Sequence, residues 1–64
     1  MDLLKYFTYE HLPEELKATS MQFYALAHWL AQTLPDGSEK TVALRKLLES
    51  KDAAVRSMAV DGKD

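Results

Sequence analysis

The chain contains no cysteine, and its 64 residues include only two histidines, two glycines and two prolines. The lack of cysteine excludes disulfides and thiolate ligands, and His11 and His28 are too few to build a typical zinc site of three or four ligands. One hydrophobic core in a chain this short rarely supplies more than about 3 to 5 kcal/mol, so small proteins add disulfides, a metal or oligomerisation. Oligomerisation is what remains, and we expect a homo-oligomer.

Long apolar runs and a strong net charge are also missing. No run approaches the roughly 20 apolar residues that span a bilayer, and the first residues lack the features of a signal peptide. We therefore expect a soluble intracellular protein with no membrane association. The net charge of −2 argues against a DNA-binding protein, because duplex binding depends on basic side chains. Residues 38–60 nevertheless hold five basic and three acidic side chains, a balance of +2 that suits a small anionic ligand.

Two proline-containing turns divide the chain. A helix is predicted over residues 13–34, with a proline at its first position and two glutamates in its first turn. Pro35 ends this helix, and Asp36 or Ser38 is expected to cap a second helix over residues 38–60.

The short connection predicts an all-α fold, an antiparallel helical hairpin that forms a single domain over residues 1–64. The N-terminal arm, residues 1–12, contains Tyr6, Phe7 and Tyr9. It is too aromatic to be a free tail, so we expect it to pack across the hairpin as an arm or short helix.

The first helix has apolar residues on two sides. One stripe should face the second helix and consists of Leu16, Phe23, Ala27, Leu30 and Leu34. Met21, Ala25 and Trp29 repeat every four residues on roughly the opposite side. Nothing within one hairpin covers this second group, so we assign it to a subunit interface. The alternative is that Trp29 packs under the N-terminal arm.

The second helix carries one apolar stripe made of Leu44, Leu47, Leu48, Ala54, Val55 and Met58. Lys51 falls in the middle of it and should either extend to water along its methylenes or meet an anion. Arg45 and Arg56 share another face, each four residues from an acidic side chain, which predicts surface ion pairs with Glu49 and Asp52.

Residue patterns for catalysis are weak. Ser20 and His28 lie eight residues apart on one helix without an evident acidic partner, and no glycine-rich phosphate loop exists. His11 forms only a loose cluster with neighbouring glutamates. We predict that the protein is not an enzyme and has no catalytic residue, metal site or cofactor.

Several segments together resemble a known family. They are residues 9–12 (YEHL), 23–27 (FYALA), 35–40 (PDGSEK), 42–49 (VALRKLLE) and 53–56 (AAVR). In this pattern, across roughly residues 6–60, the chain resembles the phage cyclic-nucleotide sponges that counter CBASS and Thoeris immunity and share a helical hairpin.

The resemblance implies a non-catalytic protein that assembles, as hexamers in the better known relatives, and sequesters cyclic di- or trinucleotides or cyclic ADP-ribose isomers. An aromatic residue stacks a base in such proteins, and Tyr9 matches it. Lys40, Thr41 and Arg45 fall in the region that holds phosphate. Tyr24 stands where the family has a lysine, and Ser38 stands where a basic residue is common.

The leading hypothesis is therefore a sponge in the cytoplasm of an infected bacterial host. The candidate ligand-binding residues are Tyr9, Tyr24, Lys40, Thr41 and Arg45. The alternative is a small helical module that docks on another protein through its Met21/Trp29 face. A third hypothesis is a helical enzyme subunit that supplies an interface rather than chemistry.

Overall fold

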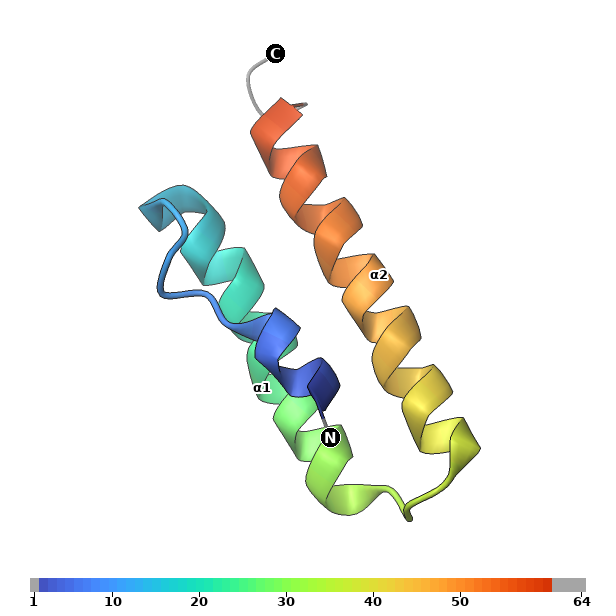
Figure 1. The fold of residues 1–64 in the computed structure, drawn as a ribbon. Coiled ribbons are helices and arrows are strands. Elements are labelled where there is room, and N and C mark those ends of the chain that lie inside the picture. The colour runs from blue at the N-terminus through green and yellow to red at the C-terminus, as the bar shows by residue number, and fades with distance from the viewer. Residues whose placement is uncertain (1, 61–64) are drawn as a thin grey trace.

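The computed structural model describes residues 2–60 as two antiparallel helices with a short helix laid against them (Figure 1). The chain forms a 3-10 helix η1 (Asp2–Phe7), then α1 (Glu14–Thr33) and α2 (Ser38–Val60). The predicted all-α hairpin is confirmed, and the predicted arm contains a short helix that packs against both long ones. Met1 and the polar tail 61–64 lie outside the described residues.

Helix α1 is one residue shorter at each end than predicted. Pro13 lies just before the helix, with φ −57° and ψ 155°, and its carbonyl accepts hydrogen bonds from the N–H groups of Leu16 and Lys17. At the other end Leu34 is extended, with φ −77° and ψ 142°. This conformation is expected before Pro35, because the proline ring excludes the helical region for the residue that precedes it.

Helix α2 begins at Ser38, as predicted, after a turn that depends on Gly37. This glycine has φ +154°, which residues with a side chain rarely adopt. Its carbonyl accepts a hydrogen bond from the N–H of Thr41. The carboxylate of Asp36, predicted as a possible cap, instead accepts a hydrogen bond from the ammonium group of Lys40.

The hydrophobic core is small and takes one fully buried side chain from each element: Phe7, Ala27 and Leu44. Partly buried apolar residues surround it, namely Leu3, Leu4, Phe23, Tyr24, Leu30, Ala31, Leu47 and Leu48. The arm is therefore part of the core, since its Phe7 has no exposed surface.

The prediction that Lys51 extends to water is wrong, because its side chain is buried. Its ammonium group lies 3.9 Å from an anionic group, the carboxylate of the neighbouring Asp52, but its shorter contact is with the backbone. It donates a hydrogen bond of 2.9 Å to the backbone carbonyl of Tyr6. Carbonyls in the last turn of a helix have no partner within the helix, and this end carries partial negative charge. Lys51 thus ties the end of η1 to the middle of α2.

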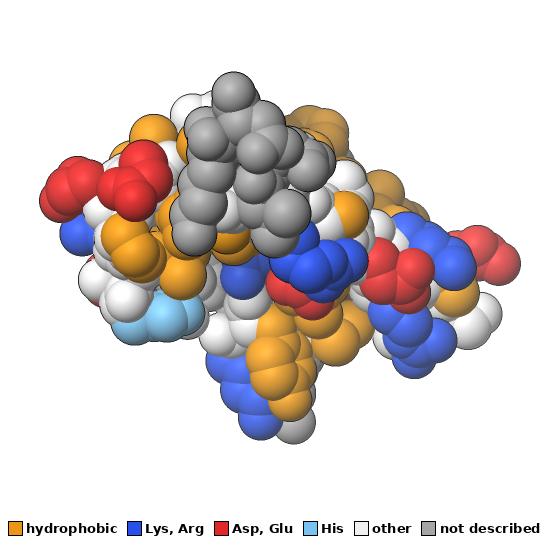
Figure 2. Space-filling model, turned by 90° about the horizontal axis from the view of Figure 1, so that it is seen from above, with side chains coloured by type: hydrophobic (Ala, Val, Ile, Leu, Met, Phe, Trp, Pro, Cys, Tyr) orange, Lys and Arg blue, Asp and Glu red, His pale blue; other side chains and the backbone are white. Residues whose placement is uncertain are grey.

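The surface of α2 carries mixed charges, and Figure 2 shows positive and negative side chains interspersed on one side of the molecule. The predicted ion pairs of Arg45 and Arg56 do not form among residues 2–60. Glu49 lies 3.8 Å from Lys46 instead, and Asp52 lies 3.9 Å from the ammonium group of Lys51. A basic residue four positions before an acidic one, as in the first predicted pair, is also the weaker orientation on a helix.

Neither α1 nor α2, within the part of the chain that is described, has an apolar stretch long enough to cross a membrane.

Candidate functional site

The aromatic half of the candidate ligand site is a row of three rings. The ring of Tyr9 meets that of Tyr24 edge to face, with 5.2 Å between centroids and 78° between planes. The ring of His28, one turn further along α1, lies 4.3 Å from that of Tyr24 at 42°. Tyr9, Tyr24 and His28 are all half-buried.

Tyr9 is held in this row by the loop between η1 and α1. The burial of Phe7 anchors the loop on one side, and on the other the carbonyl of Tyr9 accepts a hydrogen bond from the N–H of Leu12 at 3.1 Å. A ring whose backbone and one edge are already positioned loses little rotational freedom when a base stacks on it. The placement suits a stacking role.

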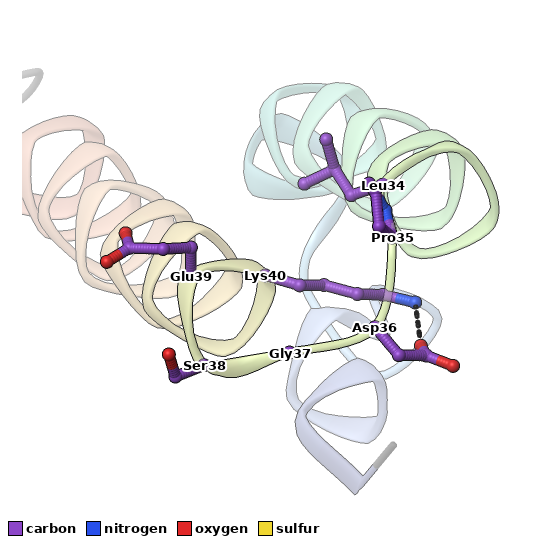
Figure 3. A pocket seen from close by; sticks show the side chains of 7 residues that line it. All are labelled: Leu34, Pro35, Asp36, Gly37, Ser38, Glu39 and Lys40. Atoms are coloured by element: carbon purple, nitrogen blue, oxygen red, sulfur yellow. Dashed lines mark hydrogen bonds and ion pairs between the residues drawn. The ribbon is translucent and has the colours of Figure 1, made fainter.

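Lys40, predicted to hold phosphate, is already paired. Its side chain is only 9% exposed and reaches across the interhelix turn to Asp36, where its ammonium group donates to the carboxylate at 2.9 Å (Figure 3). This hydrogen bond and the charge of Lys40 hold the pKa of the Asp36 carboxyl below its ordinary value. The pair lines an open depression of about 530 Å³ formed by residues 34–40. The acidic side chains of Asp36 and Glu39 also line it, which makes it unfavourable for phosphate.

Arg45 is the candidate cation that is available. It is exposed, and among the described residues it forms no ion pair or hydrogen bond with a side chain. Thr41 lies one helical turn before it and is therefore on the same side of α2. A guanidinium group and a hydroxyl at this spacing are suited to phosphate oxygens, because both donate hydrogen bonds and one is charged.

The candidate ligand residues thus form two groups. Tyr9 and Tyr24 are in contact, and Thr41 and Arg45 share a side of α2. No hydrogen bond, ion pair or ring contact within residues 2–60 joins one group to the other. Lys40 belongs to neither, because its partner is Asp36.

The predicted interface residues lie on the outer side of α1. Trp29 is 58% exposed and Met21 44%, and Ala25 between them is exposed as well. The alternative that the arm covers Trp29 is therefore wrong; the arm packs on the core through Phe7. Leu26, which was not among the predicted interface residues, is also 44% exposed.

This outer side of α1 carries no charge. From residue 18 to residue 35 the chain has no Asp, Glu, Lys or Arg, and the three charged residues of α1 all lie in its first turn. A helix face that remains in water normally carries charged side chains opposite its apolar stripe. An uncharged face with a tryptophan and a methionine has the composition of an interface core, where charged residues are depleted.

The residues considered for catalysis or metal binding are not brought together. The hydroxyl of Ser20 is fully buried without a hydrogen-bond partner, whereas His28 packs against Tyr24. Across residues 2–60, no three His, Cys, Asp or Glu side chains lie close enough together to hold a metal ion.

Comparison with known proteins gives no match: no protein-family model matches the chain, and neither a curated protein nor a solved structure does.

Proposed function

We propose that the protein is a non-catalytic homo-oligomer that binds cyclic di- or trinucleotides without a cofactor and withholds these second messengers from host anti-phage signalling. On this proposal it acts in the cytoplasm of an infected bacterium. The resemblance described above supplies the class of ligand and favours a hexamer.

The observation that carries the proposal is the division of the candidate ligand residues into two groups. A cyclic oligonucleotide has bases, which stack on aromatic rings, and phosphates, which bind cations. Within residues 2–60 of one chain, no ring contact, hydrogen bond or ion pair joins Tyr9 to Arg45. A pocket that contains both kinds of group is therefore expected at a junction between subunits.

The exposed side of α1 supports assembly independently of any ligand. The described part of the chain has three fully buried apolar side chains, which is a small core, and Trp29 remains more than half exposed. Burial of a large aromatic side chain is among the strongest contributions to an interface. Assembly through this side supplies the stabilisation that a single hairpin lacks.

The first test is native mass spectrometry of the protein with cyclic di- and trinucleotides and cyclic ADP-ribose isomers, using linear dinucleotides as controls. It reports subunit number and ligand number together. We expect unchanged cyclic ligand bound in a fixed ratio to an oligomer. A protein that is monomeric at micromolar concentration and binds none of the nucleotides would refute the proposal.

Matched variants test the site itself. Arg45→Ala should weaken nucleotide binding about 10- to 100-fold, since a hydrogen bond to a charged group is worth about 1.5 to 3 kcal/mol. Arg56→Ala is the control, because Arg56 is also exposed on α2 but was not assigned to the site. The control for Tyr9→Ala is Tyr6→Ala, because Tyr6 is 52% exposed and was not assigned to the site. If the two variants of a pair lose the same amount of nucleotide affinity, the assigned residue does not belong to the site.

A second candidate function rests on the same exposed side of α1. Trp29 and Met21 form an apolar surface that could dock on a different protein. An oligomer that binds none of the nucleotides would favour this docking module.

A further inference from the structure

Four exposed residues of α1 form two pairs placed at equal distances on either side of Ala25. Met21 lies four residues before it and Trp29 four residues after it, about 6 Å away along the helix axis in each direction. Ala18 and Gln32 lie seven residues to either side, and both are exposed. Seven residues turn an α-helix through nearly two full turns, so these two positions lie almost in line with Ala25.

We infer that α1 pairs with α1 of a second copy in antiparallel orientation, on a two-fold axis that passes beside Ala25. This inference rests on the assembly in the proposed function and specifies its geometry. The axis places Met21 against the partner subunit's Trp29, and Trp29 against the partner subunit's Met21. Methionine sulfur against an aromatic ring is a favourable contact, and the small side chain of Ala25 lets the two helices approach closely.

A second copy is the occupant that this surface fits, because a two-fold rotation beside Ala25 sets the exposed apolar side chains of Met21 and Trp29 against each other. Two-fold interfaces require such self-complementarity. The hairpin is also elongated: its radius of gyration is 12.4 Å, whereas a compact domain of this length has about 10.7 Å. With dimensions of 41 × 18 × 15 Å, the hairpin leaves much of its apolar surface in water.

Electrostatics selects the antiparallel orientation over the parallel one. Glu14 and Glu15 occupy the first turn of α1, and the rest of the helix beyond Lys17 is uncharged. Parallel pairing would bring together two positive helix ends and two first turns, each with the two glutamates and Lys17 and therefore a net charge of −1. Antiparallel pairing separates the two pairs of glutamates by roughly the 30 Å length of a helix of 20 residues.

Cysteine cross-linking tests the geometry directly, because the natural sequence contains no cysteine. A disulfide forms only where two Cα atoms come within about 7 Å. Ala25→Cys lies beside the axis and should cross-link to its own copy. Ala18→Cys should not, since antiparallel pairing puts the two copies of residue 18 about 21 Å apart along the axis. A mixture of Ala18→Cys with Gln32→Cys should form the mixed dimer.

Ala53→Cys is the control for random collision, because Ala53 is exposed on the outer side of α2. After mild oxidation, the covalent dimer is measured on non-reducing gels. We expect Ala25→Cys to form it at least 10-fold faster than Ala53→Cys. Equal rates for the two would overturn the inference. Comparable self-cross-linking of Ala18→Cys and Ala25→Cys would also overturn it, since that result indicates parallel pairing.

Nucleotide binding by the same variants, kept reduced, separates this inference from the proposed function. Binding to an oligomer in which Ala25→Cys does not cross-link would refute the two-fold pairing and leave the sponge intact. Cross-linking in the predicted pattern without any nucleotide binding would confirm the pairing and refute the sponge.

Discussion

The hydrogen bond from Lys51 to the carbonyl of Tyr6 should hold the N-terminal arm in place, and Lys51→Met tests it. Methionine has nearly the length of the lysine side chain and keeps its apolar packing, but it cannot donate. A hydrogen bond to a charged group contributes about 1.5 to 3 kcal/mol, and part of this is offset because the substitution also removes a buried charge. We expect the free energy of unfolding to fall by about 1 to 2 kcal/mol.

Lys51→Ala would be a poorer test of the same bond. It also removes buried methylene groups worth about 0.8 kcal/mol each, and the total would approach the whole stability expected for a chain this size. The control is Lys46→Met on the same helix, where the side chain is 71% exposed and its ion pair with Glu49 is long. That change should cost about 0.5 kcal/mol or less.

The assay is urea unfolding followed by circular dichroism at one fixed protein concentration, since assembly makes stability depend on concentration. Amide hydrogen exchange of residues 2–7 supplies the second measurement, because release of the arm should raise exchange there before it does in α1 or α2. An unfolding free energy within about 0.3 kcal/mol of the natural protein, with unchanged exchange in η1, would show that this hydrogen bond does not hold the arm.

Three further predictions concern single side chains. Ser20→Ala should raise the unfolding free energy by about 1 kcal/mol, because the buried hydroxyl has no hydrogen-bond partner and alanine favours the helix. The control is Ser50→Ala at an exposed position, which should gain only the helix preference. A lower unfolding free energy for Ser20→Ala would show that the hydroxyl makes a hydrogen bond that the structure lacks. In an NMR titration the pKa of Asp36 should lie below its ordinary value and rise when Lys40 is replaced by Met. The pair therefore stabilises the fold above the ordinary carboxyl pKa and loses this contribution as pH falls through the lowered one, so an unchanged Asp36 titration in the variant would refute the pairing. The fluorescence emission of Trp29 should shift to the blue as protein concentration rises, because assembly buries a side chain that is 58% exposed in one chain. A constant emission wavelength, together with an increase in the mass of the assembly, would place the interface elsewhere.

The local pattern of the sequence was sufficient for the fold. Helix starts and stops depend on proline, glycine and acidic residues within a few positions, and these predicted both helices to within one residue. The stripe that contains Phe23, Ala27 and Leu30 follows from helical periodicity alone, and the structure confirms that it faces the core.

The candidate site was less predictable, because its details depend on which groups become neighbours. Lys40 and Arg45 are both basic residues in the first two turns of α2, yet one is paired with Asp36 and the other is unpaired within the described residues. The contact between Tyr9 and Tyr24 joins residues from two elements, and no spacing rule within one helix predicts it.

Residue type, a helical period of 3.6 and the short connection between the helices were enough to predict an antiparallel pair of helices, an aromatic arm and an apolar group on the outer side of α1. The role of Lys51 became apparent only from the folded structure. Its ammonium group meets the carbonyl of Tyr6, which is 45 residues away along the chain. Every residue has a backbone carbonyl, so the sequence does not indicate which carbonyl Lys51 will bind. That depends on the packing of the end of η1 against α2.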